Sequence, residues 1–322
     1  DNDCGDYSIE IDPRECSKQK LHLLRYEGFN RISLGVQDID EKVQKAVNRL
    51  QPIELVEDLV ERARHIKFKS INMDLIYGLP FQTAKSFSKT VERIIELSPD
   101  RLSVFNYAHL PDRFTPQRRI NQEDLPPPGA KLEILENTIC QLEEAGYVYI
   151  GMDHFAKPTD ELAIAQQQGQ LHRNFQGYTT HKDCDLVAMG ISSISHIGPY
   201  IFQNSPNMDI YIKEIDSGRM PIVKGLKTSR DDDIRGAVIM ELICHFELDK
   251  QQIADRFEIN FDEYFGEEME RLAEFEDDGL LEVDGNTIRI APQGRILIRT
   301  VCMVFDAYLP KQGATDSFSR VI

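Results

Sequence analysis

The sequence predicts an α/β protein, with parallel strand–helix units in residues 1–150 and a mainly helical region in residues 229–322. Short apolar runs alternate with helically spaced stretches in the first part, which is typical of parallel βα units. The 322 residues are 41% hydrophobic and 28% charged, as in an ordinary globular protein rather than a disordered one. This length allows one large domain or two of ordinary size.

Five short apolar runs and four helical stretches alternate along the first 150 residues. The expected strands are 8–11, 31–36, 71–77, 101–107 and 147–151. The expected helices are 17–27, 53–66, 84–97 and 129–145. In the second of these helices, apolar residues recur at intervals of three and four, which predicts one buried face. No GxGxxG or GxxxxGK[ST] loop follows a strand, so the Rossmann and P-loop folds lose their main support.

The array begins abruptly, because only six polar or small residues and Tyr7 precede the first strand. Counted from there, the strands are too few for a full (β/α)8 barrel. We expect either an open sheet or a chain that lacks its first βα units, with the strand 8–11 exposed at an edge.

Residues 151–228 lose the regular alternation, so we expect an irregular connecting segment that contributes to the active site. Helical spacing returns at 231–246, 250–257 and 261–278. A hairpin, 280–283 with 287–290, and a closing helix, 293–309, follow. This order is winged-helix-like. The predicted domains are therefore 1–150, 151–228 and 229–322.

Charge and cysteine spacing exclude several classes of function. With 37 basic and 54 acidic residues, the net charge of −17 disfavours binding to a phosphate backbone. No apolar run approaches the roughly 18 residues of a membrane span, so we expect no membrane partner and a cytoplasmic location. The cysteines are Cys4, Cys16, Cys140, Cys184, Cys244 and Cys302, at least 12 positions apart. This spacing predicts neither a zinc site nor a disulfide framework.

Polar residues lie at the carboxyl ends of the predicted strands, where ligands of parallel βα folds collect. They are Glu10, Gln37 with Asp38, Asp74 and Asn106. A buried carboxylate needs hydrogen-bond donors or a cationic ligand. Each residue alone could cap a helix, but together they predict a shared site.

Three further positions carry open alternatives. His154 is either a general acid–base or a structural residue beside aromatic side chains. His172-Arg173 either recognises a carboxylate through the planar guanidinium or lies in a solvated loop. Cys184 follows Lys182 but has no neighbouring base, so we expect it to be inert.

Several segments resemble a known family. IEIDPRE (9–15), GFNRISLGVQD (28–38) and DLIYGLP (74–80) are similar to radical S-adenosylmethionine enzymes of haem biosynthesis. RLSVFNYAHLP (101–111), GMDHFA (151–156) and NFQGYTT (174–180) narrow the resemblance to the oxygen-independent coproporphyrinogen III oxidases. The match runs from Tyr7 to Ile322. Haem-chaperone paralogues, which bind and transfer haem, share the early segments but not NFQGYTT, and they stay as the alternative.

The resemblance implies a (β/α)6-type barrel and a radical oxidoreductase. A [4Fe–4S] cluster, held by the three cysteines of a CxxxCxxC loop, would reduce S-adenosylmethionine to give a 5′-deoxyadenosyl radical. The radical would abstract hydrogen from the β-carbon of a propionate of coproporphyrinogen III. Loss of carbon dioxide, and of an electron to an unidentified acceptor, would leave a vinyl group. Two propionates react, giving protoporphyrinogen IX, and two S-adenosylmethionine molecules are implied in the site.

The family's cofactor contacts can be placed on this sequence. They are Glu10, Gln37, Arg49, Asp74, Ala108, Phe175, Gln176 and Ile194. Carboxylates can accept from ribose hydroxyls or an ammonium group, and an arginine can bind the ligand's carboxylate. Catalytic residues stay unassigned. The propionate contacts are candidates on charge alone, namely Arg118, Arg119, His172 and Arg173.

The sequence departs from the family pattern in one respect. Neither the CxxxCxxC loop nor a GGTP-type loop occurs in the 322 residues, so we expect no metal ligands in this chain. The expectation is a carboxyl-terminal portion that lacks about the first two βα units of the barrel. By itself it should be inactive. We also expect it to be a monomer.

Overall fold

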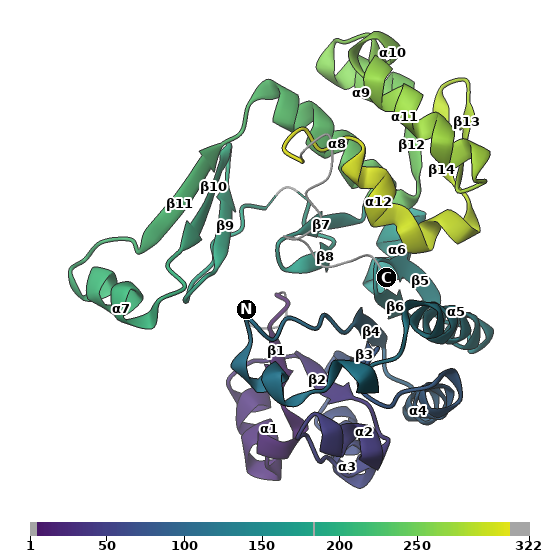
Figure 1. Ribbon diagram of the computed structural model, residues 1–322. Coiled ribbons are helices and arrows are strands. Elements are labelled where there is room, and N and C mark those ends of the chain that lie inside the picture. The colour runs from purple at the N-terminus through teal and green to yellow at the C-terminus, as the bar shows by residue number, and fades with distance from the viewer. Residues whose placement is uncertain (1–4, 183, 310–322) are drawn as a thin grey trace. The chain divides into compact units, whose positions relative to one another are not determined.

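The computed structural model describes residues 5–182 and 184–309, which form two compact units. Unit 1 holds residues 5–163 and unit 2 holds residues 164–309 of the described part. Figure 1 shows the elements of both units. The end of the family resemblance, residues 310–322, lies outside the described residues.

Unit 1 is built on a mixed sheet, which within residues 5–163 has six strands in the order β1-β2-β3-β4-β6-β5. The first four pair in parallel, and β6 pairs antiparallel with both neighbours. Their bounds are β1 (Ser8–Ile11), β2 (Arg31–Gln37), β3 (Ser70–Tyr77), β4 (Arg101–Asn106), β5 (Val148–Gly151) and β6 (His154–Ala156). The five expected strands are confirmed, and β1 lies at the edge of the sheet.

The apolar pattern does not predict β6. Its three residues are too few to show alternation. The chain turns back from β5 because Gly151 and Met152 adopt positive φ angles of 132° and 55°. As a result, β6 lies between β4 and β5 and interrupts the parallel array.

Helices connect the strands of unit 1. They are α1 (Lys18–Tyr26), α2 (Glu41–Ala46), α3 (Ile53–His65), α4 (Ala84–Leu97) and α5 (Pro128–Glu144), with short 3-10 turns η1 (Pro13–Glu15), η2 (Thr115–Arg119) and η3 (Gln122–Asp124). Side chains fix the starts of α1 and α4, where Ser17 accepts from the Lys20 amide and Thr83 forms a capping box with Ser86. The expected helices are confirmed. The six-residue α2 was not expected.

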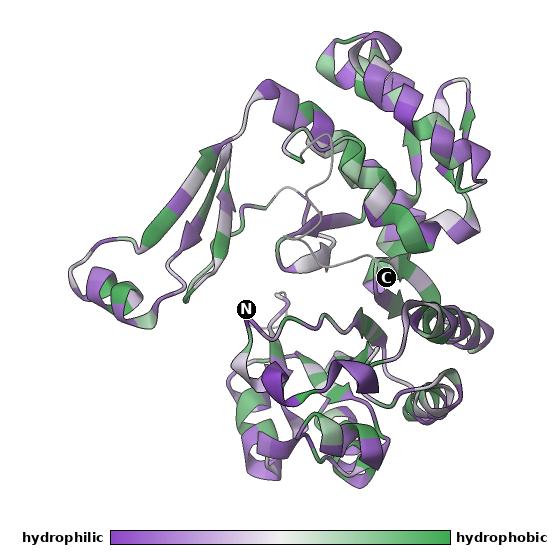
Figure 2. Ribbon diagram, in the orientation of Figure 1, coloured by the Kyte–Doolittle hydropathy of each residue, from purple (hydrophilic) through white to green (hydrophobic). Residues whose placement is uncertain are grey.

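The two faces of this sheet differ in chemistry. Along β2, Ile32, Leu34 and Val36 are buried, and they alternate with polar or small residues. The helices carry alternating apolar and polar bands, as helices with one buried face do (Figure 2). The apolar side chains therefore form the core under the helices. The opposite side of the strands, here called the polar face, includes Ser33, Gly35, Asn72, Asp74 and Ser103.

Unit 2 begins with antiparallel strands, which corrects the expectation of an irregular segment. β7 (His172–Asn174) pairs with β8 (Gly177–Thr179), and β9 (Ile194–Ile197), β10 (Tyr200–Asn204) and β11 (Ile222–Lys227) form a sheet in the order β11-β10-β9. α6 (Glu161–Gln167) precedes them, and α7 (Met208–Asp216) links β10 to β11. The strands are short, and all six residues of β11 are exposed, so no buried face imposes an alternating pattern.

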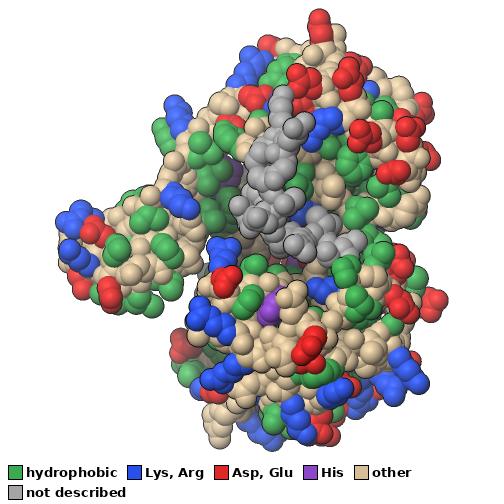
Figure 3. Space-filling model, viewed as in Figure 1, with side chains coloured by type: hydrophobic (Ala, Val, Ile, Leu, Met, Phe, Trp, Pro, Cys, Tyr) green, Lys and Arg blue, Asp and Glu red, His purple; other side chains and the backbone are tan. Residues whose placement is uncertain are grey.

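Apolar side chains gather on the surface of α7 and β11, where Figure 3 shows them in green. Those at least two fifths exposed include Met208, Ile210, Ile212, Ile215, Ile222, Val223 and Leu226. An exposed apolar patch of this kind is uncommon on a monomeric surface.

The rest of unit 2 is mainly helical. Its elements are α8 (Arg230–His245), β12 (Glu247–Asp249), α9 (Lys250–Phe257), α10 (Phe261–Tyr264), α11 (Gly266–Asp277), β13 (Leu281–Asp284), β14 (Thr287–Ile290), η4 (Pro292–Leu297) and α12 (Ile298–Met303). The expected hairpin is confirmed as β13–β14, and β12 adds a third strand beside β14. Phe265 and Phe305 are fully buried, with ring centres 5.4 Å apart.

Two helix predictions in this region are wrong in extent. The stretch 261–278 forms two helices, α10 and α11, that meet at the buried Phe265. The stretch 293–309 begins as a 3-10 turn and continues only to Met303 as α-helix. A Cβ on Gly294 would lie 1.9 Å from the Leu280 carbonyl oxygen, so this turn is packed directly on backbone. In the described residues, no helix combines the length and hydrophobicity needed to cross a membrane.

Candidate functional site

Strand register places two of the predicted site residues on the polar face. Glu10 on β1 lies beside Ser33 on β2, and Asp74 on β3 lies beside Gly35 on β2. Residues in register on neighbouring strands share a face of the sheet. Glu10 and Asp74 are therefore on the same side, one strand apart, as the sequence predicted.

A small polar network fixes the carboxylate of Asp74. Its Oδ2 accepts from the Ser33 hydroxyl at 2.6 Å, and its Oδ1 accepts from Asn72 Nδ2 at 2.8 Å. Asn72 Nδ2 also lies 2.8 Å from Ser33 Oγ. These partners are uncharged, so they orient the carboxylate without neutralising it. A ligand that brings hydroxyl groups or an ammonium group would complete its hydrogen bonding.

Arg49, which follows α2, reaches the carboxyl end of β2. Its Nη2 donates to the Gly35 carbonyl at 2.9 Å and its Nη1 to Asp12 Oδ2 at 3.1 Å. Arg14 hydrogen-bonds the same carboxylate and lowers the pKa of Asp12 to about 2, so Asp12 is ionised at neutral pH. The Nε atom of Arg49 is buried and has no hydrogen-bond partner in residues 5–182 or 184–309.

Gln37 ends β2 with a left-handed backbone, φ 69°, after an irregularity in the pairing of β2 with β3. Its side chain turns back toward Gly35, because a Cβ built on Gly35 would lie 2.9 Å from Gln37 Nε2 and 3.2 Å from Arg49 Nη2. Gln37 Oε1 is buried without a partner among the described residues. The Gln37 acceptor and the Arg49 donor, which both lack a partner in the described part of the chain, thus belong to side chains that meet at Gly35. A polar ligand bound there would satisfy both atoms.

Asp38 is part of the structure that supports Gln37 and not a ligand-facing residue. It is 1% exposed and accepts from Thr90 Oγ1 and Gln82 Nε2, both at 2.6 Å, and from the Asp40 amide at 2.9 Å. Gln82 Nε2 also donates to the Ile76 carbonyl at 2.9 Å. Burial raises the pKa of Asp38. The grouping of Asp38 with the other strand-end residues is therefore corrected.

At the end of β4, one unpredicted residue joins the strand-end groups. Lys131, in the first turn of α5, lies with its Nζ 3.4 Å from Asn106 Oδ1 and 3.2 Å from the Tyr107 carbonyl. Burial lowers the pKa of Lys131. The Ala108 carbonyl accepts from Gln117 Nε2 at 3.1 Å. An isolated lysine in a helix gives no sequence signal, so only the packing of α5 reveals it.

His154 lies on β6, in register with Ser103. Its ring packs edge-on against Phe105, with ring centres 5.9 Å apart. This aromatic contact fits the structural alternative for His154. The strand register aligns His154 with Ser103 on β4, and Ser103 with Asp74 on β3.

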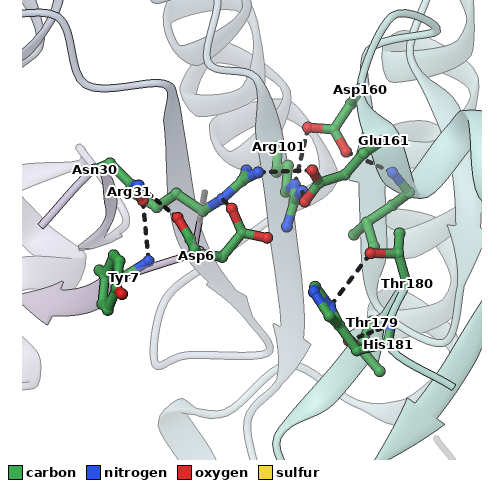
Figure 4. A network of polar contacts seen from close by, with 12 residues as sticks. Asp6, Tyr7, Asn30, Arg31, Arg101, Asp160, Glu161, Thr179, Thr180 and His181 are labelled. Atoms are coloured by element: carbon green, nitrogen blue, oxygen red, sulfur yellow. Dashed lines mark hydrogen bonds and ion pairs between the residues drawn. The ribbon is translucent and has the colours of Figure 1, made fainter. Parts of the chain in front are cut away.

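The amino ends of the same strands are held by ion pairs (Figure 4). Arg31 on β2 binds Asp6 at 2.8 Å and Glu161 at 2.7 Å. Arg101 on β4 binds Asp160 at 2.9 Å and the other oxygen of Glu161 at 2.7 Å. Glu161 therefore joins two strands that lie on either side of β3. Both guanidinium groups have carboxylate partners, which is typical of a structural network.

Three predicted contacts lie in unit 2. Phe175 and Gln176 form the turn between β7 and β8, where Phe175 is 54% exposed and the Gln176 amide donates to Asn174 Oδ1 at 2.8 Å. Ile194 begins β9 and is half-buried. In unit 1, by comparison, Gln37 meets Arg49 at Gly35, and Glu10 and Asp74 both neighbour Ser33.

Two hollows of about 300 Å³ each on unit 1 open between helices, one lined by residues of α1 and α3 and the other at the starts of α2 and α4. Neither includes Glu10, Gln37 or Asp74.

The donor set fits S-adenosylmethionine but not an iron–sulfur cluster. The buried Arg49 Nε suits a carboxylate, and Gln37 Oε1 with Asp74 suits an ammonium group or ribose hydroxyls. Across the described part of the chain, no three His, Cys, Asp or Glu side chains are grouped to hold a metal ion. The five described cysteines are all free.

Known families and proteins are similar to this chain. Residues 5–94 match the family model of the radical SAM superfamily, and residues 228–297 match that of the HemN C-terminal domain. The chain is 56% identical over 322 residues to an oxygen-independent coproporphyrinogen III oxidase of Pseudomonas aeruginosa, covering all of this chain and 70% of the relative. It is 46% identical over 319 residues to one of Thermostichus vulcanus, covering 99% of this chain and 98% of the relative.

A solved structure is also similar. Coproporphyrinogen III oxidase (HemN) from Escherichia coli, described as a radical SAM enzyme, aligns with a TM-score of 0.93 at 51% identity. The alignment covers 96% of this chain and 71% of that one.

Proposed function

The chain belongs to the oxygen-independent coproporphyrinogen III oxidase family of radical S-adenosylmethionine enzymes, and we propose that it acts in the oxidative decarboxylation of coproporphyrinogen III. It has the family's α/β fold with a helical carboxyl-terminal region. The activity is that of an oxidoreductase, and it belongs to haem biosynthesis. The observation that carries the proposal is the pair of unsatisfied atoms, Gln37 Oε1 and Arg49 Nε, at the carboxyl end of β2.

The strand-end residues would bind S-adenosylmethionine, of which the resemblance implies two molecules. Arg49 offers its Nε to the carboxylate of the ligand, while Gln37 Oε1 accepts from its ammonium group or a ribose hydroxyl. Asp74 is held by Ser33 and Asn72 to accept a second hydrogen bond, and Glu10 lies on the same face with β2 between it and Asp74. When bound, S-adenosylmethionine supplies the adenosyl group from which the family's hydrogen-abstracting species comes.

For each propionate, the substrate loses one hydrogen atom from the β-carbon, one carbon dioxide molecule and one electron, and a vinyl group remains. The electron goes to an external acceptor. The described residues contain no cluster ligands, so we derive no step through a cluster for them. Their proposed contribution is to bind and orient the cofactor and the substrate.

We also propose the domain boundary that the sequence predicted at 228; the boundary predicted at 150 falls within β5, and the sheet of unit 1 continues through β6 to Ala156. Unit 1 would be part of a (β/α)6-type barrel, with β1 at an edge where a further strand can pair. The helices α8, α9 and α11 with the sheet β12-β14-β13 support a winged-helix-like module. The acidic first turn of α8, Asp231 to Asp233, disfavours a nucleic-acid role for it. The monomeric state and the cytoplasmic location stay predictions.

Binding of S-adenosylmethionine to the chain, measured by isothermal titration calorimetry, tests the proposal. We expect Arg49→Gln to weaken binding by about 10- to 100-fold, because a charged hydrogen bond is lost. Arg93→Gln is the matched control, since Arg93 pairs with Glu57 and Glu96 on exposed helix surface. Equal affinities of the two variants, or no binding by the wild-type chain, would contradict the proposal. Binding of haem in place of coproporphyrinogen would favour the haem-chaperone alternative.

A further inference from the structure

The structure separates the three arginines among the candidates for propionate binding. Arg118 is exposed, and its Nε donates to the Pro111 carbonyl at 3.0 Å, while Arg119 is exposed as well. Arg173 on β7 is half-buried, and its Nη1 is buried without a hydrogen-bond partner in the described part of the chain. Of the arginines with such an atom there, Arg173 alone has a terminal guanidinium nitrogen unsatisfied, since the others lack a partner only for Nε.

The guanidinium of Arg173 is held in place by its neighbours. It lies over the ring of Tyr178, its cross-strand partner on β8, with 4.8 Å from the guanidinium carbon to the ring centre. The Tyr178 hydroxyl donates to the Ile243 carbonyl on α8 at 3.1 Å, which fixes the ring. The Arg173 amide approaches Met240 Sδ, also on α8, at 3.3 Å. Stacking on one face leaves the edge of the guanidinium free to form paired hydrogen bonds.

Among residues 164–182 and 184–309 no carboxylate neutralises Arg173, because none of the ion pairs found there includes it. The titratable group beside it on α8 is Cys244, which is fully buried. Burial raises the pKa of the Cys244 thiol to about 12, so it is neutral at pH 7 and cannot serve as a counter-ion. A partly buried cation without a partner is costly unless an anion joins it.

The anion that suits this arrangement is a carboxylate, whose two oxygens match the edge of a guanidinium. We propose that Arg173 binds a propionate carboxylate of the porphyrinogen substrate, and that this propionate is one that the reaction retains. Decarboxylation removes the negative charge, so an ion pair that stabilises the carboxylate would oppose the reaction at that side chain. Arg173 is thus a residue for substrate specificity and orientation, and the inference rests on the proposed function.

Binding of two free-acid porphyrins to the chain tests this, followed by quenching of porphyrin fluorescence. Coproporphyrin III has four propionates, and protoporphyrin IX keeps only the two that do not react. We expect Arg173→Gln to weaken binding of both by about 10-fold or more, because the same charged contact is lost in each. Arg173→Lys should weaken binding less, since lysine keeps the positive charge but cannot form the paired hydrogen bonds of a guanidinium. The tetramethyl ester of coproporphyrin III should bind wild type and Arg173→Gln equally.

Arg119→Gln, which removes the same charge from an exposed position, is the matched control and should bind like wild type. S-adenosylmethionine affinity should be unchanged in Arg173→Gln, which shows that the variant is folded. If Arg173→Gln weakened binding of coproporphyrin III but not of protoporphyrin IX, the assignment of Arg173 to a retained propionate would be overturned. Equal effects of Arg173→Gln and Arg119→Gln would overturn the site itself. If the wild-type chain binds neither porphyrin, the proposed function fails as well.

Discussion

The two ends of the polar face in unit 1 use the same chemical groups in different ways. At the amino ends, Arg31 and Arg101 each bind two carboxylates, and both share Glu161. At the carboxyl ends, the buried Arg49 Nε and Gln37 Oε1 lack partners among the residues described. Saturated polar groups stabilise a fold, whereas unsatisfied buried ones need an explanation, which a bound ligand, an ion or a water molecule can supply. We therefore propose that the amino end is structural and that the carboxyl end binds the ligand, as in other βα folds.

The largest effect is expected from Arg101→Gln at the amino end. It leaves Asp160, whose side chain is 6% exposed, without its cation, so we expect a loss of about 2–3 kcal/mol in the free energy of unfolding. Urea unfolding followed by circular dichroism measures it. Affinity for S-adenosylmethionine should not change in the folded variant. A tenfold loss of S-adenosylmethionine affinity in Arg101→Gln would contradict the distinction between a structural amino end and a ligand-binding carboxyl end.

Asp38→Asn should affect both stability and binding. An asparagine cannot accept from Thr90, Gln82 and the Asp40 amide together, so we expect a loss of about 1–2 kcal/mol. Because Asp38 fixes the backbone next to Gln37, the affinity for S-adenosylmethionine should also fall. Unfolding and calorimetry on the same sample give both values. An unchanged affinity would show that the position of Gln37 does not depend on Asp38.

Gly35→Ala should affect binding with little effect on stability. The new methyl group would meet the ends of the Gln37 and Arg49 side chains, which can move without disturbing the core. We expect about a tenfold loss of S-adenosylmethionine affinity, or about 1.4 kcal/mol. Gly129→Ala is the control, because its Cβ would meet nothing within 4 Å. Equal affinity of the two variants would refute the convergence of ligand groups at Gly35.

The smallest effect concerns pH. The pKa of Asp12 is lowered from 3.8 to about 2, chiefly by its hydrogen bond with Arg14. A lowered pKa in the folded state gives stability that is present above pH 4 and is lost as the pH falls toward 2. We therefore expect the stability difference between wild type and Asp12→Asn to shrink over this range, as measured by urea unfolding at several pH values. A difference that stays constant would show that the ion pair does not contribute.

Sequence patterns predicted the strands and helices of unit 1 other than the short elements β6 and α2, because its core imposes a regular alternation of apolar residues. The strand-end rule grouped Glu10 with Asp74, and both lie on the polar face, although Asp74 is in the middle of β3 and its role in binding stays a prediction. It could not show that Asp38 turns into the interior, because this follows from the left-handed backbone of Gln37. The rule also could not predict the hydrogen bond from Arg49 to the Gly35 carbonyl, because this contact requires the loop after α2 to fold back on β2. The antiparallel strands β7 to β11 are short, and β11 is fully exposed, so they leave no pattern, whereas the hairpin β13–β14 was predicted.

The most direct test is the NMR signal of the arginine Nε–H groups during titration with S-adenosylmethionine. If the unsatisfied atoms at the carboxyl ends are the ligand-binding atoms, the Arg49 Nε–H resonance shifts to saturation while those of Arg31 and Arg101 stay in place. An Arg49 resonance that does not move when the ligand is bound, or equal shifts at both ends of the polar face, would contradict the account.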